Sequence, residues 1–133
     1  LRRHNINDYR RNPFFPINTL QLMRGAIAAE KTGNAMDYKD YIDAVFQAMW
    51  VQGLDMGQTE VVTEALKDFS FSIQTILDKS TDSTIKQQLI ANTENSVARG
   101  NFGSPTFFVG EEMFFGKDKL IDVEEEINRQ LEV

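Results

Sequence analysis

The sequence predicts an α/β protein in which consecutive helices are followed by a strand, a turn, a second strand and a last helix. Apolar side chains recur with helical spacing from residue 18 to residue 100, and glycines interrupt the pattern. Two short apolar runs, Thr106–Val109 and Met113–Phe115, then flank a turn at Gly110–Glu112. After Gly116 the spacing becomes helical again. The order of elements is therefore helices first, then ββα.

The first seventeen residues predict little regular structure. Tyr9–Asn12 is compatible with a short strand, and Pro13 and Pro16 then prevent regular structure around the two phenylalanines between them. The one histidine of the chain, His4, cannot form a metal cluster alone, and we expect it to be an exposed polar residue.

The first helix is predicted at residues 19–31, with Asn18 as its N-cap and an apolar stripe of Leu20, Met23 and Ile27. Four more helices follow, at residues 37–52, 58–69, 72–79 and 83–99, and Gly53 and Gly100 end the first and the last of these four. Six large apolar side chains are predicted to form the core of this helical part: Phe46, Met49, Trp50, Leu66, Phe69 and Leu89.

Pro105 stands directly before the first predicted strand, where it removes a donor from the sheet. A helical segment followed by a proline-led ββα unit is the C-terminal half of a thioredoxin-like domain, in which this proline is cis. The alternative is a proline at the edge of a strand with no functional role. Two strands and one helix are too few for a stable sheet, so we expect an N-terminal βαβ unit to be lacking from the chain.

The predicted fold class is thus α/β and thioredoxin-like, with an all-helical insertion. The parts are a remnant of the N-terminal thioredoxin half at residues 1–17, the helical insertion at 18–100 and the C-terminal ββα at 101–133.

Composition excludes several classes of function. The chain has 133 residues, 41% of them hydrophobic, and a net charge of −6, which disfavours general nucleic-acid binding. No apolar run approaches the roughly 20 residues of a membrane span. With no cysteine, the chain has no disulfide, thiolate metal site or redox dithiol. We expect no metal, no membrane and no nucleic acid as partners, and a cytoplasmic location.

Three stretches carry a resemblance to a known family: NPFFPINTLQLMRGAIAAE, VFQAMW and NTENSVARGNFGSPTFFVGEEMFFGKDKL. They resemble the 2-hydroxychromene-2-carboxylate isomerase family, which is related to kappa-class glutathione transferases and to DsbA-type thioredoxin folds. The resemblance covers essentially the whole chain, and FGSPTFFVG followed by FFGKD is its most specific part.

The resemblance implies glutathione as cofactor, a small aromatic substrate and a homodimer. It also implies a catalytic serine in an N-terminal segment that these 133 residues do not contain, so the catalytic residue lies outside the chain and the chain alone is expected to be inactive. The backbone of Ser104, before Pro105, would pair with the cysteinyl unit of glutathione, and the γ-glutamyl end would be held by Phe115, Gly116, Lys117 and Asp118.

Alternatives stay open at each of these points. Asp118 could accept from the ligand's ammonium group, or it could be a first-turn acid that complements the helix dipole. Phe14 and Phe15 could line the substrate pocket or fill the core, and Trp50 could border the pocket. For the protein, a DsbA-like disulfide oxidoreductase, a kappa-type glutathione transferase and a non-catalytic binding module are the alternatives to an isomerase.

Overall fold

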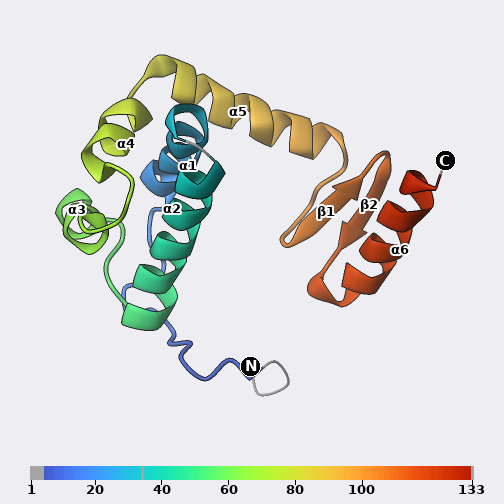
Figure 1. Ribbon diagram of the computed structural model, residues 1–133, viewed down its shortest axis with the longest axis horizontal. Helices are drawn as coiled ribbons and strands as arrows, with labels where there is room; N and C mark the ends of the chain where they lie inside the picture. The colour runs from blue at the N-terminus through green and yellow to red at the C-terminus, as the bar shows by residue number, and fades with distance from the viewer. Residues whose placement is uncertain (1–4, 34, 133) are drawn as a thin grey trace. The chain divides into compact units, whose positions relative to one another are not determined.

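The computed structural model describes residues 5–33 and 35–132, and the chain divides into two compact units, residues 1–91 and 92–133. The last helix of the first unit, α5 (Ser83–Ala98), continues into the second (Figure 1). His4, for which exposure is expected, lies outside the described residues.

The first unit is helical, and its elements confirm most of the predicted segments. They are α1 (Leu20–Thr32), α2 (Ala35–Gln47), the π-helix η2 (Ala48–Gln52), α3 (Thr59–Leu66), α4 (Ile73–Ser80) and the beginning of α5. Gly53, which ends η2, has a φ of 71°, and Gly100, after α5, has a φ of 92°. Both are left-handed positions that favour glycine at a helix end, as expected.

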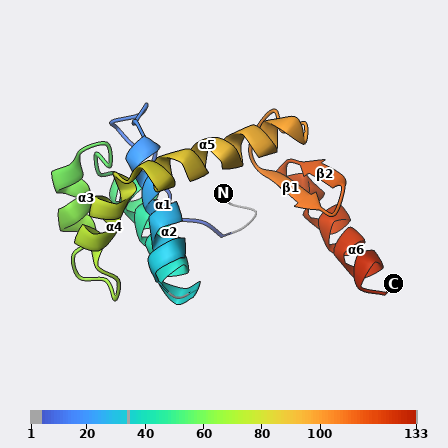
Figure 2. The same ribbon diagram turned by 90° about the horizontal axis from the view of Figure 1, so that it is seen from above.

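Helix α1 lies beside α2 and α4, which Figures 1 and 2 show, and small residues permit this close packing. Ala28 and Ala29 are almost fully buried, and Gly25 faces the buried ring of Tyr41. The Tyr41 hydroxyl donates to the carbonyl of Leu22 at 3.0 Å, and burial raises the pKa of this phenol. A hydroxyl with a partner can be buried at little cost, so α2 is fixed against α1 by packing and by one polar contact.

For two of the six side chains that were predicted to lie in the core, the prediction is wrong. Phe46 is 60% exposed, because Tyr41, Ala44, Val45 and Ala48 occupy the inward-facing positions of α2 and η2. Phe69 is 43% exposed because it follows the end of α3, where helical periodicity no longer applies, and it stacks on the buried Phe71. Met49 and Leu66 are buried, and Trp50 and Leu89 are partly buried against the core.

The apolar stripe predicted for the first helix is also partly wrong. Leu20 and Met23 are exposed, whereas Ile27 is buried together with Leu22. The predicted N-cap Asn18 lies one residue before the observed cap, Thr19, and its Oδ1 accepts from the N–H of Leu20 at 3.0 Å. Asn18 therefore still satisfies a free donor of the first turn.

No strand forms at residues 9–12, which corrects that expectation. Instead, the N–H of Arg10 donates to the carbonyl of Trp50 at 2.7 Å. The side chain of Asn12, 2% exposed, donates to the carbonyls of Met49 at 2.9 Å and Leu54 at 2.8 Å. The segment thus binds the end of the second helix, where the expected α-helix becomes a π-helix.

The second unit contains the hairpin and the last helix. Strands β1 (Thr106–Val109) and β2 (Glu112–Phe115) pair antiparallel, with Thr106 opposite Phe115, and Gly110 enters the two-residue turn with a φ of 56°. A 3₁₀ turn, η3 (Lys117–Lys119), leads into α6 (Leu120–Leu131), the last helix in Figure 1. Helix α6 packs against β1. Among residues 92–132, which the structure describes, no side chain is fully buried.

Candidate functional site

The candidate glutathione site lies on the hairpin of the second unit. The Ser104–Pro105 bond is cis, as the sequence predicts. Across the hairpin, the N–H of Gly116 donates to the carbonyl of Pro105 at 2.9 Å. This hydrogen bond extends the ladder beyond Thr106 and Phe115. The structure therefore brings together the two stretches, 104–105 and 115–118, that were selected as binding residues.

The loop before β1 is held by side chains that the sequence analysis did not select. Asn101 Oδ1 accepts from the N–H of Gly103 and from the hydroxyl of Thr106, both at 3.0 Å. The Thr106 hydroxyl also lies 2.7 Å from the carbonyl of Gly103. An asparagine and a threonine five residues apart, on either side of a Gly-Ser-Pro turn, are the signal that could have indicated this network. Exposed Ser104 is thereby presented on a defined loop.

Gly116 has a backbone conformation that fits no other residue well. Its φ is 100°, and a Cβ at this position would lie 2.5 Å from Oδ1 of Asp118. Asp118 and Lys117 are both exposed in the turn that leads into α6. The next lysine, Lys119, is paired with Asp122 at 2.8 Å, and the hydrogen bond from that carboxylate raises the pKa of Lys119.

Phe115 is half-exposed and packs on an exposed aromatic neighbour. Its ring centroid lies 4.6 Å from that of Phe102, which is 72% exposed. A Cβ at Gly103 would lie 2.8 Å from the ring of Phe115, so the absence of a side chain there allows the ring to lie against the loop. An accessible aromatic surface of two rings therefore adjoins the loop that carries Ser104.

The outer edge of β1 has backbone groups that face away from β2. Pro105 and Gly116 are a hydrogen-bonded pair, so in an antiparallel ladder the backbone groups of Thr106 and Phe108 point to the other side. An extended peptide-like ligand can pair with such an edge. The guanidinium of Arg99 lies 3.9 Å from the centre of the Phe108 ring and donates to the carbonyl of Gly110 at 2.6 Å.

Phe14 and Phe15 belong to the first unit, and both are exposed. They therefore do not fill the core, and a role in contacting the substrate stays a proposal. The N–H of Phe14 donates to Asn12 Oδ1 at 2.8 Å, and the Phe15–Pro16 bond is cis. The second cis proline was not predicted from the sequence.

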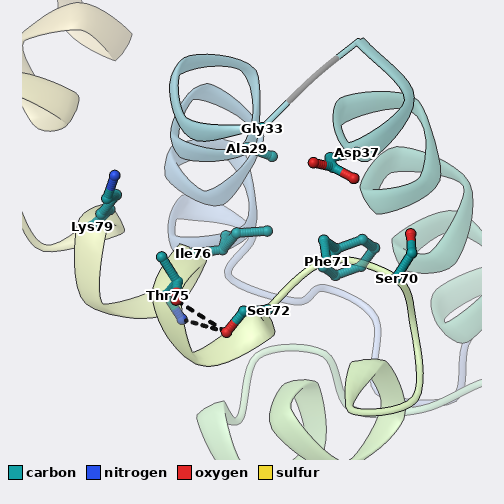
Figure 3. A pocket seen from close by; sticks show the side chains of 9 residues that line it. All are labelled: Ala29, Gly33, Asp37, Ser70, Phe71, Ser72, Thr75, Ile76 and Lys79. Carbon is teal, nitrogen blue, oxygen red and sulfur yellow. Dashed lines mark hydrogen bonds between the residues drawn. The ribbon is translucent and has the colours of Figure 1, made fainter.

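A hollow of about 240 Å³ with a mixed polar and apolar lining lies between α1, α2 and α4 (Figure 3). Asp37, Ser70 and Lys79 line it together with the first turn of α4. Ser72 Oγ accepts from the N–H of Thr75 at 3.3 Å and lies 3.0 Å from its hydroxyl, which the dashed lines in Figure 3 mark. Ser72 therefore has a structural role as the cap of α4, and the hollow contains none of the predicted site residues.

Within residues 5–33 and 35–132, no cluster of three or more metal-ligating side chains occurs. In the same part of the chain, no helix combines the length and the hydrophobicity needed to cross a bilayer.

The helical first unit, the hairpin led by a cis proline and the helix that packs on it define an α/β thioredoxin-like fold with a helical insertion. The profile of the DsbA-like thioredoxin domain family matches residues 8–128, and the chain belongs to this family.

One solved structure, of a 2-hydroxychromene-2-carboxylate isomerase, is similar with a TM-score of 0.65 and 22% sequence identity. The match covers 82% of this chain and 54% of the other, so the chain spans about half the length of the solved structure that it matches. No curated protein matches the chain.

Proposed function

We propose that the protein is a glutathione-dependent isomerase of the 2-hydroxychromene-2-carboxylate isomerase type, which acts on aromatic or related electrophiles through a glutathione thiol. One observation carries the proposal: the hydrogen bond from Gly116 to Pro105 places the Ser104–Pro105 turn beside the Phe115–Asp118 stretch. The two halves of a binding site for an extended, zwitterionic tripeptide would thus lie on one hairpin.

Each group has a role that follows from its chemistry. The backbone at Ser104 would pair with the cysteinyl unit, as a strand edge pairs with an extended peptide. The carboxylate of Asp118 would accept from the ammonium group, and the charge of Lys117 and the positive end of the α6 dipole would attract the neighbouring carboxylate. The proposal assigns the thiol-activating serine to a segment outside these 133 residues, so we expect these residues alone to show no isomerase activity.

Two related activities are the alternatives. A kappa-type glutathione transferase would use the same cofactor site, and Phe14 and Phe15 would contact the aromatic substrate in either case. A DsbA-like disulfide oxidoreductase is favoured by the family to which the chain belongs. It requires a cysteine pair, and these 133 residues contain no cysteine. Reduction of a protein disulfide without glutathione would favour the oxidoreductase.

The proposal is tested by calorimetric titration of the full-length protein with glutathione. Asp118→Ala removes a charge-assisted contact and should cost on the order of 1.5–3 kcal/mol of binding free energy, which is about tenfold or more in affinity. Ser104→Ala should change the affinity little, because only the backbone is used at that position.

Two controls make the test specific. Asp122→Ala removes a neighbouring acid that is paired with Lys119, and glutathione affinity should stay unchanged. A glutathione analogue without the α-amino group should bind the unmodified protein more weakly and should lose nothing further in Asp118→Ala. Equal affinity of Asp118→Ala and the unmodified protein, or a large loss in Ser104→Ala, would refute the site.

Self-association is part of the proposal. In these 133 residues alone, no side chain of residues 92–132 is fully buried, so the apolar surface of the hairpin and the outer edge of β1 would gain from coverage by a second copy. We therefore expect a homodimer, and a monomer in light scattering at high protein concentration would contradict it. Because the cytoplasm keeps glutathione reduced, we place the protein there.

A further inference from the structure

An apolar hollow of about 210 Å³ opens between α1 and the end of α2, entirely within the first unit. Its walls are side chains of three elements: Met23 and Ala26 of α1, Val45 and Phe46 of α2, and Met49 and Trp50 of η2. No charged residue lines it among the described residues. Val45 and Met49 are buried at its floor, whereas Met23 and Phe46 are exposed at its rim.

The π-helix η2 builds one wall of this hollow. Single π-turns within helices are rare and occur frequently at functional sites, because they change the direction of side chains. Here the altered turn is supported from outside: Asn12 Nδ2 donates to the Met49 carbonyl, and the N–H of Arg10 donates to the Trp50 carbonyl. The positions of Met49 and Trp50 are therefore fixed by contacts that do not depend on the hollow being filled.

Trp50 is held further by a second ring. Tyr9 stacks on it with a centroid separation of 5.9 Å and an interplanar angle of 24°. The wall is thus preorganised, and an incoming ligand would not need to order it.

The volume and the lining decide what kind of molecule can fill the hollow. One turn of a helix with its side chains occupies about 500 Å³, which is too large. An extended peptide would bring backbone N–H and C=O groups against a wall with almost no polar partners. The hydroxyl of Tyr41, which also lines the hollow, already donates to Leu22. An engineered apolar cavity of about 150 Å³ holds one benzene ring, so a molecule of one or two rings fits.

We propose that this hollow binds a small, flat, uncharged aromatic molecule. Methionine sulfur contacts aromatic rings favourably, and Met23 and Met49 lie on two different walls. Phe46 and Trp50 offer ring edges and faces for stacking. An ionised ligand would lose its hydration without gaining a counter-charge, so the hollow discriminates by charge. This inference is independent of the proposed glutathione chemistry of the second unit.

The test uses toluene as the neutral probe and benzoate as its charged counterpart of similar size. Trp50 is the one tryptophan of the chain, so its fluorescence reports on the hollow directly. Isotope-labelled methionine methyl groups give a second, independent readout by NMR. We expect toluene to produce a saturable change in the Trp50 emission and in the methyl signals of Met23 and Met49. Benzoate should produce no saturable change up to the same concentration.

Two variants locate the binding. Ala26→Leu fills the hollow and should weaken toluene binding about tenfold or more, which corresponds to loss of most of the buried contact area. Met23→Gln alters only the exposed rim, so it should fold normally, and it should weaken binding by about threefold or more. Met36→Gln is the matched control, because Met36 is exposed on α2 and does not line the hollow; its affinity should equal that of the unmodified protein.

Three results would overturn the proposal. The first is that toluene and benzoate change the Trp50 emission and the methionine methyl signals equally. The second is that Met23→Gln and Met36→Gln bind toluene equally well. The third is that Trp50 emission without any probe depends on protein concentration, which would show that a side chain of a second copy fills the hollow.

Discussion

Asn12→Asp should destabilise the protein strongly, although it exchanges only an amide nitrogen for an oxygen. Asn12 is 2% exposed, and its side chain makes three hydrogen bonds, two as donor to the carbonyls of Met49 and Leu54 and one as acceptor from the N–H of Phe14. Aspartate has the same shape and keeps the acceptor, but as a carboxylate it cannot donate. The buried carbonyl of Met49 and the part-buried carbonyl of Leu54, which also accepts from the N–H of Met56, would then face a negative charge instead of an amide.

The magnitude follows from those two carbonyls. Loss of the donor to the buried Met49 carbonyl costs about 1–3 kcal/mol, and the lost bond at Leu54 and the buried negative charge add to this, so we expect a loss of about 3–4 kcal/mol in the free energy of unfolding. For a chain of this length that corresponds to roughly 10 °C in Tm. At about pH 4 part of the carboxyl group is protonated and can donate to one carbonyl, so the loss should be smaller there than at about pH 8.

The assay is urea unfolding followed by circular dichroism and by Trp50 fluorescence at both pH values. Asn18→Asp is the matched control, because Asn18 uses its Oδ1 as acceptor from the N–H of Leu20. A carboxylate serves equally well at a helix start, so the change in stability should stay within about 0.5 kcal/mol. If Asn12→Asp is as stable as Asn18→Asp, the bonds of Asn12 do not support the π-helix as described.

Substitutions at three more places test other contacts. Gly25→Ala would place a Cβ in overlap with the Tyr41 hydroxyl and should lower the free energy of unfolding by about 1–3 kcal/mol. When Tyr41 is replaced by phenylalanine, the same Gly25→Ala change should cost less, which thermal unfolding of the two single variants and the double variant measures. Ser72→Ala removes the cap of α4 and should lower stability by about 1 kcal/mol in urea unfolding. Hydrogen bonds from Arg129 hold the pKa of Glu126 below its ordinary value, so Arg129→Gln should raise that pKa in an NMR titration.

The sign of the last effect also sets a pH dependence. Because the folded pKa of Glu126 is lowered, its contribution to stability is present above the unfolded pKa and is lost as the pH falls through the folded value. If the free energy of unfolding depends on pH in the same way in the unmodified protein and in Arg129→Gln, Arg129 is not the cause of this pH dependence. If Gly25→Ala costs the same with and without the Tyr41 hydroxyl, or if Ser72→Ala leaves stability unchanged, the other two contacts do not act as described.

Local rules predicted much of the fold because most elements begin and end at residues with strong local preferences. Gly53 and Gly100 end helices in left-handed conformations, Ser72 starts α4, and Pro105 directly precedes β1. These features depend on neighbours in the sequence, so a single sequence contains the necessary information.

What was missed depends on contacts between distant residues. Asn12 lies 37 residues from Met49, and nothing in the sequence around either one indicates their hydrogen bond. Sequence patterns therefore predict an ordinary α-helix where the π-turn, and with it the apolar hollow, occurs. Periodicity assigns Phe46 to the core, but a helix with apolar residues on more than one face does not specify which face is inward. The candidate site was selected by resemblance, and its Asn101 network was overlooked for a different reason: its signal, an asparagine and a threonine five residues apart, is local but is common in loops.

The uneven burial of the two units has a consequence for hydrogen exchange. Amides of α1, which lies among fully buried side chains, should exchange only when the first unit unfolds as a whole. The amides of β1 and β2 lack such a core and should exchange through openings of the hairpin that need far less free energy. A ligand or another chain that covers Phe102 and Phe115 will slow hydrogen exchange in the hairpin first. The exchange rates of the β1 and β2 amides therefore report whether this aromatic surface is covered.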